Sequence, residues 1–237
     1  MPAKLVPTVQ TKYSQFELDQ GLIKGWIKLF GTPPTKSQIG VLWSQNALET
    51  GLTAAMWCNN IGNVKYVPNA GDTEAVHYCM LRNVWEIING KKVYFQPPSP
   101  ATWFRAFDTL EEGVAFFFDL LRNRRYKAAW TAIEAGDPAL FAHLLKVAGY
   151  YTASEADYRN AMLRYYNAFM ASNDFEKALA AVVMPTDPAP VVTDPVIVPE
   201  PLIIPPLNPI SLPSSNLSFI ETIWQVLKNI FSAFKRN

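Results

Sequence analysis

Two glutamates, Glu49 and Glu86, lie in sequence contexts that favour acid–base chemistry by their carboxyl groups. Glu49 falls in the last turn of a predicted helix over 36–50, where the partial negative charge of the helix end raises the pKa of a carboxyl group. Nearby apolar residues, among them Trp43 and Trp57, would raise that pKa further by excluding water. A protonated carboxyl can donate its proton to a leaving oxygen, and a second carboxylate can stabilise a cation or activate water. The pair therefore predicts cleavage of a glycosidic bond, with Glu49 as the acid and Glu86 as the second group.

Local sequence signals define the two elements that would position these carboxylates. Thr35 with Gln38 three residues later has the spacing of a capping box, and Gly51 suits the left-handed residue that follows a helix. The segment "NVWEIINGKKVYFQ" contains two strand-like runs around Asn89-Gly90, a strong hairpin signal. We therefore expect a helix-borne glutamate to face a hairpin-borne one across a cleft.

Similar capping signals mark three more helices, so most of 12–184 is predicted to be helical. With the hairpin lobe between residues 59 and 103, the predicted class is α+β. The predicted caps are Asp108 with Glu111, Asp137 with Pro138 and a stop at Gly149, and Thr152 with Glu155.

The composition permits a substantial core and excludes several classes of function. Of the 237 residues, 49% are hydrophobic and 17% are charged, and the net charge is +1. A nucleic-acid binder would normally carry a strong basic excess. Cys58 and Cys79 lack the spacing of a metal site and are expected to be free thiols, although one bridge is conceivable. His77 and His143 lie far apart in the sequence, so we expect neither a metal nor another cofactor.

The chain divides into three predicted parts. Residues 1–184 form the helical domain, and residues 185–213 contain ten prolines, which predicts an extended polyproline linker. Residues 214–237 predict one amphipathic helix. The N-terminus lacks the apolar core of a secretory signal, and no run reaches the length of a membrane-spanning helix. We therefore expect synthesis in a cytoplasm without a recognisable export address.

The C-terminal helix has the features of a docking element. Ser218 and Glu221 have capping-box spacing. The apolar residues of 219–235 form one continuous stripe: Ile220, Ile223, Trp224, Leu227, Ile230, Phe231 and Phe234. The expected partner is another protein or a second copy of the chain. Packing on its own domain and binding to a membrane surface are the alternatives.

Four segments together resemble glycoside hydrolase family 73, which comprises peptidoglycan N-acetylglucosaminidases with a lysozyme-like fold. "ALETG" followed by "NNIGNVK" is similar to the family pattern A-L-E-S/T-G … N-N-x-F-G-I-K. "VWEIINGKKV" resembles the family hairpin, which carries an acidic residue before an N-G turn. "FRAFDTLEEGVAFFFDLL" and "LLKVAGYYTASEADYRNAM" resemble two further family segments, in the same order. The resemblance covers roughly residues 35–170 and implies a lysozyme-like fold for the first domain.

The resemblance assigns roles to individual residues. Glu49 matches the family's general acid, and Glu86 matches the hairpin carboxylate proposed as the second catalytic group. Asn60 and Gly62 match the amide segment that lines the cleft, and Tyr150 matches the tyrosine of the G-Y-x-T motif. Trp57, Tyr66 and Trp85 flank this cleft in sequence and are candidates for stacking on sugar rings.

Three departures from the family pattern bear on the substrate geometry. Leu52-Thr53 stands where the family usually has Trp-Gly, and Gly62-Asn63 replaces the usual Phe-Gly. The loop over 66–83 is longer than typical. It contains Asp72 and Glu74, either of which could replace Glu86 in the second role.

The resemblance implies a peptidoglycan hydrolase that cuts β-1,4 glycosidic bonds. Without an export signal, such an enzyme would suit a bacteriophage. It would be made in the host cytoplasm and act at the cell wall, either as a virion component or after release through a membrane hole. The substrate's N-acetyl group could take the place of the second carboxylate. The alternatives are a muramidase or lytic transglycosylase on the same fold, and an inactive virion protein that binds wall glycan.

Overall fold

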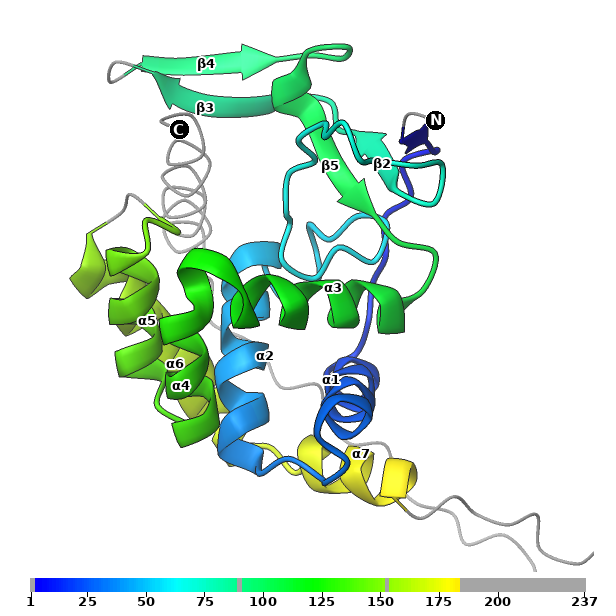
Figure 1. Cartoon of the computed structure of the whole chain (residues 1–237). Helices are drawn as coiled ribbons and strands as arrows, with labels where there is room; N and C mark the ends of the chain where they lie inside the picture. The colour runs from blue at the N-terminus through cyan, green and yellow to red at the C-terminus, as the bar shows by residue number, and fades with distance from the viewer. Residues whose placement is uncertain (1–2, 89–90, 152–153, 184–237) are drawn as a thin grey trace, which may run out of the picture.

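The computed structural model describes residues 3–88, 91–151 and 154–183, which form a helical body and a smaller set of strands (Figure 1). This mostly helical arrangement with a few strands confirms the α+β class predicted from the sequence. The helices are α1 (Gln15–Phe30), α2 (Lys36–Thr50), α3 (Leu110–Arg122), α4 (Lys127–Ala135), α5 (Pro138–Val147), α6 (Glu155–Ala171) and α7 (Asp174–Val183). The strands are β1 (Lys4–Leu5), β2 (His77–Met80), β3 (Val84–Ile88), β4 (Lys91–Phe95) and β5 (Trp103–Ala106).

The helix that carries Glu49 has the predicted limits. At its N-terminus the Thr35 hydroxyl accepts from the Gln38 backbone N–H, and the Gln38 side chain bonds back to the Thr35 backbone. Gly51 ends α2 in the left-handed conformation, with φ of 59°. Asp137 and Pro138 likewise open α5 as predicted. Short-range contacts within one turn are sufficient for these ends, so the sequence reveals them.

Two predicted caps are wrong by one or two residues. Thr109, not Asp108, caps α3: its hydroxyl accepts from the Glu112 backbone N–H at 3.2 Å. Extended backbone at Thr109 directs its hydroxyl toward the first turn. Ser154 caps α6 in place of Thr152, which lies outside the described residues.

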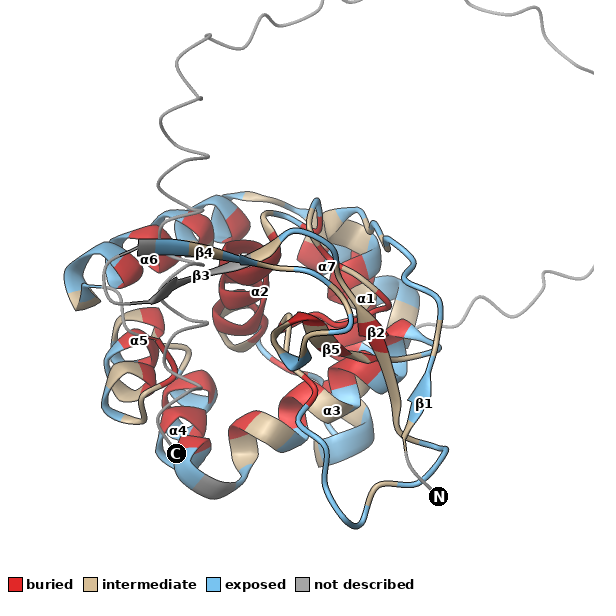
Figure 2. Ribbon diagram, turned by 90° about the horizontal axis from the view of Figure 1, so that it is seen from above, coloured by how far each residue is buried: buried red, intermediate tan, exposed pale blue. Residues whose placement is uncertain are grey.

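Helix α2 lies at the centre of the helical body. Every residue from Ile39 to Thr50 is buried, and α1, α4, α5 and α6 pack around it (Figure 2). Trp43 contacts the rings of Tyr165 and Phe169 on α6, at centroid distances of 6.4 Å and 5.4 Å. Because a central helix must bury all of its faces, polar residues of α2 are enclosed together with apolar ones.

The strands form two separate sheets. β1 pairs in parallel with β2, and β2 pairs antiparallel with β5, so that Cys79 is opposite Phe104. β3 and β4 form the predicted antiparallel ribbon, with Glu86 opposite Val93. The turn residues Asn89 and Gly90 lie outside the described residues. The ribbon extends from the sheet above the helical body, on the side where α2 ends (Figure 1).

The predicted linker 185–213 and helix 214–237 also lie outside the described residues, so both stay predictions. Within the described part of the chain, no helix combines the length and apolar character needed to cross a membrane.

Candidate active site around Glu49

Glu49 is enclosed in the last turn of α2. Only 1% of its surface is exposed, although it is a carboxylic acid. Buried carboxyl groups need hydrogen-bond partners or must remain neutral, because water no longer stabilises their charge. The surroundings of Glu49 therefore decide its protonation state.

Tyrosines from three segments surround this carboxyl group. The Tyr158 hydroxyl on α6 donates a hydrogen bond to Oε1 of Glu49 at 3.2 Å. The Tyr158 ring stacks on Tyr151, with centroids 3.7 Å apart and planes 6° from parallel. Tyr126 and Tyr150 pack edge to face at 5.3 Å, and burial together with the Glu49 charge raises the pKa of both hydroxyls. The tyrosine rings thus exclude water from the Glu49 carboxyl, and the Tyr158 hydroxyl donates a hydrogen bond to it.

The pKa of Glu49 is raised to about 8 because burial penalises its charged form. The hydrogen bond from Tyr158 acts in the opposite direction, since a hydroxyl donor stabilises the carboxylate. The acid is therefore mostly protonated at neutral pH, as expected from the sequence. The surround differs from the expected one, because Trp43 packs against α6 residues and tyrosines enclose the carboxyl. Tyr158 is not among the residues predicted for the site, and the spacing of tyrosines in "YYTASEADY" is the available sequence signal for it.

Glu86 and Trp85 lie on β3, in the ribbon above the end of α2. The positions of their side chains are outside the described part of the structure. A two-carboxylate site formed by Glu49 and Glu86, and stacking by Trp85, therefore stay predictions.

Asn60 and Gly62 have structural roles, which corrects their predicted place on the cleft surface. The Asn60 amide donates to the carbonyls of Val64 and Arg105, at 2.9 Å and 3.0 Å, and its oxygen accepts from the Val64 N–H at 2.8 Å. Its hydrogen-bonding groups are therefore engaged within the loop. Gly62 is buried against Phe117, whose ring would lie 2.8 Å from an added Cβ. The sequence pattern identified a structured loop but not which atoms would face outward.

The predicted role of Tyr66 in stacking on a sugar ring is also corrected. It is only 5% exposed and stacks against Tyr78 and Trp103, with centroid distances of 4.7 Å and 6.2 Å. Arg105 lies 5.3 Å from its ring centroid. The Tyr66 ring is therefore packed within the β lobe and has little surface left for a sugar. Its hydroxyl donates to Asp72 at 2.7 Å.

Trp57 and Tyr150, two other aromatic residues predicted to bind the substrate, differ in exposure. Trp57 is half-buried, and its backbone forms an isolated β-bridge with Gln10. Tyr150 is 2% exposed and contributes to the enclosure of Glu49 instead of presenting a face to solvent. Stacking of Trp57 on a sugar remains a prediction.

The alternative second carboxylates occupy the loop before β2. Asp72 accepts from the Tyr66 hydroxyl and from the Asn69 backbone N–H at 2.8 Å, and these bonds lower its pKa. It therefore carries a charge at neutral pH and holds the turn. Glu74 is exposed on the same loop.

A pocket of about 440 Å³ opens on a different face of α2. Glu49 is not among its lining residues, so the pocket does not itself expose the candidate acid. It is mostly apolar and lies between the start of α1, the end of α2 and α6. Its lining includes Tyr13, Leu18, Trp43, Ala47, Leu52 and Tyr165.

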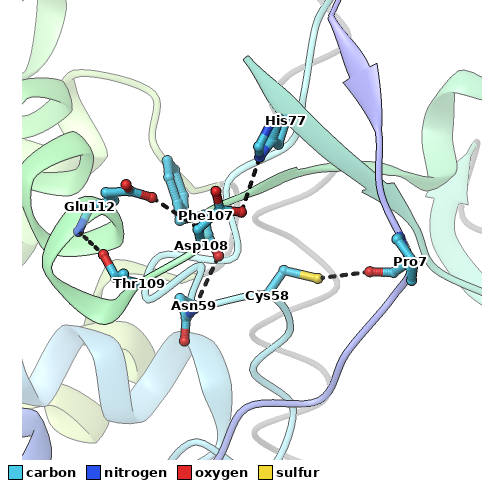
Figure 3. A network of polar contacts seen from close by, with 8 residues as sticks. All are labelled: Pro7, Cys58, Asn59, His77, Phe107, Asp108, Thr109 and Glu112. Atoms are coloured by element: carbon cyan, nitrogen blue, oxygen red, sulfur yellow. Dashed lines mark hydrogen bonds and ion pairs between the residues drawn. The ribbon is translucent and has the colours of Figure 1, made fainter. Parts of the chain in front are cut away.

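A separate polar network joins the N-terminal segment, the loop after α2 and the start of α3 (Figure 3). Asn59 donates to the Phe107 carbonyl at 3.0 Å, and His77 pairs with Asp108 at 3.1 Å. The Cys58 thiol contacts the Pro7 carbonyl at 3.6 Å. These contacts fix the base of the β lobe.

Both cysteines are buried and free, as expected. In the described residues, no group of three or more His, Cys, Asp or Glu side chains is arranged to hold a metal ion.

Comparisons with known proteins give no relative: no family model, no curated protein and no solved structure matches this chain.

Proposed function

We propose that the chain is a glycoside hydrolase that cleaves the β-1,4-linked glycan of peptidoglycan, with Glu49 as its general acid. The observation that carries this proposal is the buried Glu49 carboxyl, with a pKa of about 8 and a hydrogen bond from Tyr158. Such a group holds a proton at neutral pH, which glycosidic bond cleavage requires. The resemblance of four segments to family 73 supports the choice of substrate and a lysozyme-like fold.

The local geometry suits both halves of a proton transfer. Before the reaction, burial keeps the Glu49 carboxyl mostly protonated at pH 7, because it raises the pKa to about 8. After the proton moves to the glycosidic oxygen, the carboxylate accepts the Tyr158 hydrogen bond, which stabilises the new charge. Tyr158 therefore stabilises the Glu49 carboxylate that remains after the proton has been transferred.

The second role belongs to Glu86 in this proposal, because its strand lies in the ribbon above the end of α2. It would stabilise the oxocarbenium-like state or activate water. Assistance by the substrate's N-acetyl group is the alternative within the same mechanism. Asp72 is less suited, since its carboxylate already accepts hydrogen bonds from Tyr66 and Asn69.

A lytic transglycosylase is the second candidate, and one observation favours it. The raised pKa of Glu49 comes from burial, opposed by Tyr158, and among the side chains that the structure describes no other carboxylate contributes to it. One acidic residue with N-acetyl assistance is sufficient for that reaction. A transglycosylase leaves an anhydro sugar end and consumes no water, whereas a hydrolase leaves a reducing end.

The wider biological setting is also a proposal. A bacteriophage lysin, made in a host cytoplasm and acting at the cell wall, is the setting that we propose. The helix predicted over 219–235 would bind a virion protein or a second copy.

Mass spectrometry of purified sacculi after digestion tests the proposal. The wild type should release muropeptides whose new glycan ends identify the bond that was cut. Glu49→Gln serves as the matched control and should release none above background. Release of equal products by both proteins, or of none by the wild type, would contradict the proposal.

A further inference from the structure

The turn that follows Glu49 has an unfavourable backbone conformation. Leu52 and Thr53 are neither glycine nor asparagine, yet they have φ values of 58° and 66°. Left-handed conformations are disfavoured for such residues, so surrounding contacts must hold the turn. The turn directly follows the last helical residues, and therefore any relaxation in it would reach Glu49.

The Asn63 side chain closes this turn. Its Nδ2 donates to the backbone carbonyl of Glu49 at 2.9 Å and to that of Ala55 at 3.2 Å. These two carbonyls lie at opposite ends of the turn, so one amide group joins its entry to its exit. Asn63 itself has a φ of 46°, a conformation that asparagine tolerates better than most residues.

The carbonyls in the last turn of a helix lack intrahelical donors. Around this end, the Ala47 carbonyl accepts from Gly51 and Leu52, and the Thr50 carbonyl accepts from Ala55. The Glu49 carbonyl receives the Asn63 side chain instead. A side chain from outside the helix thus fixes the backbone of the residue whose carboxyl is buried.

We infer that Asn63 is a positioning residue, which holds the backbone of Glu49 so that its carboxyl stays enclosed against Tyr158. Its importance for catalysis rests on the function proposed above, whereas its effect on the Glu49 carboxyl does not. Asn63 does not need to contact substrate. When its two donors are removed, the turn opens and water reaches the carboxyl.

The test is a titration of Glu49 by NMR of protein labelled with ¹³C at glutamate side-chain carboxyls. Glu49→Gln identifies the signal by its loss. Asn63→Gly removes both donors but accepts a φ of 46° without strain. We expect its Glu49 midpoint to fall by about one pH unit or more, because hydration of the carboxyl removes part of the burial effect.

Two further variants separate the donors from the backbone. Asn63→Ala also removes the donors but strains the backbone, so it should shift the midpoint as Asn63→Gly does while lowering thermal stability more. Asn83→Gly is the matched control, because Asn83 has a φ of 56° and bonds to Gln96 in the hairpin lobe. It should leave the Glu49 midpoint unchanged.

The outcomes for this inference and for the proposed function are distinct. A folded Asn63→Gly protein with an unchanged Glu49 midpoint would overturn the positioning role, whatever the activity. A shifted midpoint in a protein that never cleaves glycan would support the positioning role and refute the enzyme. If the wild type is active, Asn63→Gly should lower kcat about tenfold or more with little change in KM, since a misplaced acid acts mainly on the chemical step.

Discussion

The Tyr158 hydroxyl donates a hydrogen bond to Oε1 of Glu49 across 3.2 Å, although the two residues are 109 positions apart in the chain. This contact joins α6 to the last turn of α2. It also links a neutral donor to a carboxyl whose burial favours the protonated form.

Tyr158→Phe should raise the pKa of Glu49 further, because the lost hydrogen bond stabilised the carboxylate. The high-pH limb of the pH–rate profile should therefore move to higher pH. The maximal rate should fall about tenfold, since the carboxylate formed during proton transfer is less stable. Turbidity clearing of sacculi between about pH 5 and pH 10 would measure both effects. Tyr165→Phe, on the same helix against Trp43, is the control and should leave the limb in place.

Glu49→Gln should lower glycan cleavage by about 10²–10⁴-fold, which is the usual cost of losing general acid catalysis. The amide is nearly isosteric, so the fold should persist in circular dichroism. Retention of more than about a tenth of the wild-type rate would show that Glu49 is not the acid.

Glu86→Gln should cost less activity than Glu49→Gln if the substrate's N-acetyl group assists the reaction. Equal losses in both variants would instead support two essential carboxylates. Rates on the same sacculi, compared at the pH optimum of the wild type, decide between these mechanisms.

Asp19 should make the protein less stable as the pH rises. Asp19 is fully buried on α1, and neither of its carboxyl oxygens makes a hydrogen bond of normal geometry. Burial raises its pKa from 3.8 to about 8, although the nearby Gln15 side chain opposes the shift. Between these values the folded state keeps a proton that the unfolded state has released, so the free energy of unfolding falls with rising pH. At pH 8, Asp19→Asn should therefore be more stable than the wild type by on the order of 5 kcal/mol.

Urea unfolding at several pH values measures this effect. The advantage of Asp19→Asn should shrink steadily as the pH falls and vanish below about pH 4, where both states of the wild type bind the proton. A difference that does not depend on pH would show that Asp19 is not protonated in the folded protein. Glu49 contributes a slope of the same sign, so the variant should keep part of the pH dependence.

Truncation after Met184 should leave hydrolysis of soluble wall fragments unchanged, because the ten prolines of residues 185–213 predict an extended linker beyond the catalytic domain. Association with a partner or a surface should be lost together with residues 185–237. Fragment hydrolysis and size-exclusion chromatography, each compared with the full chain, provide the two readouts. A truncated protein that misfolds or loses activity on fragments would assign the C-terminal helix to the catalytic domain.

The sequence alone determined the elements whose signals are local. The capping box of Thr35 and Gln38, the stop at Gly51 and the strands around Asn89-Gly90 depend on residues within a few positions of one another. These signals are sufficient to place Glu49 in the last turn of a helix. The one-residue error at Thr109 arose because two adjacent residues both have suitable cap side chains, and the backbone conformation selects one.

Only the tertiary structure decided which groups surround Glu49 and which predicted site residues are internal. Tyr158 reaches Glu49 from another helix, and Asn60 directs its amide to Val64 and Arg105. Tyr66 is covered by Tyr78 and Trp103, which come from two strands. Such contacts arise when segments distant in the chain pack together. The protonation of a buried acid depends on that packing, because burial and hydrogen bonding set the free energy of its charged form.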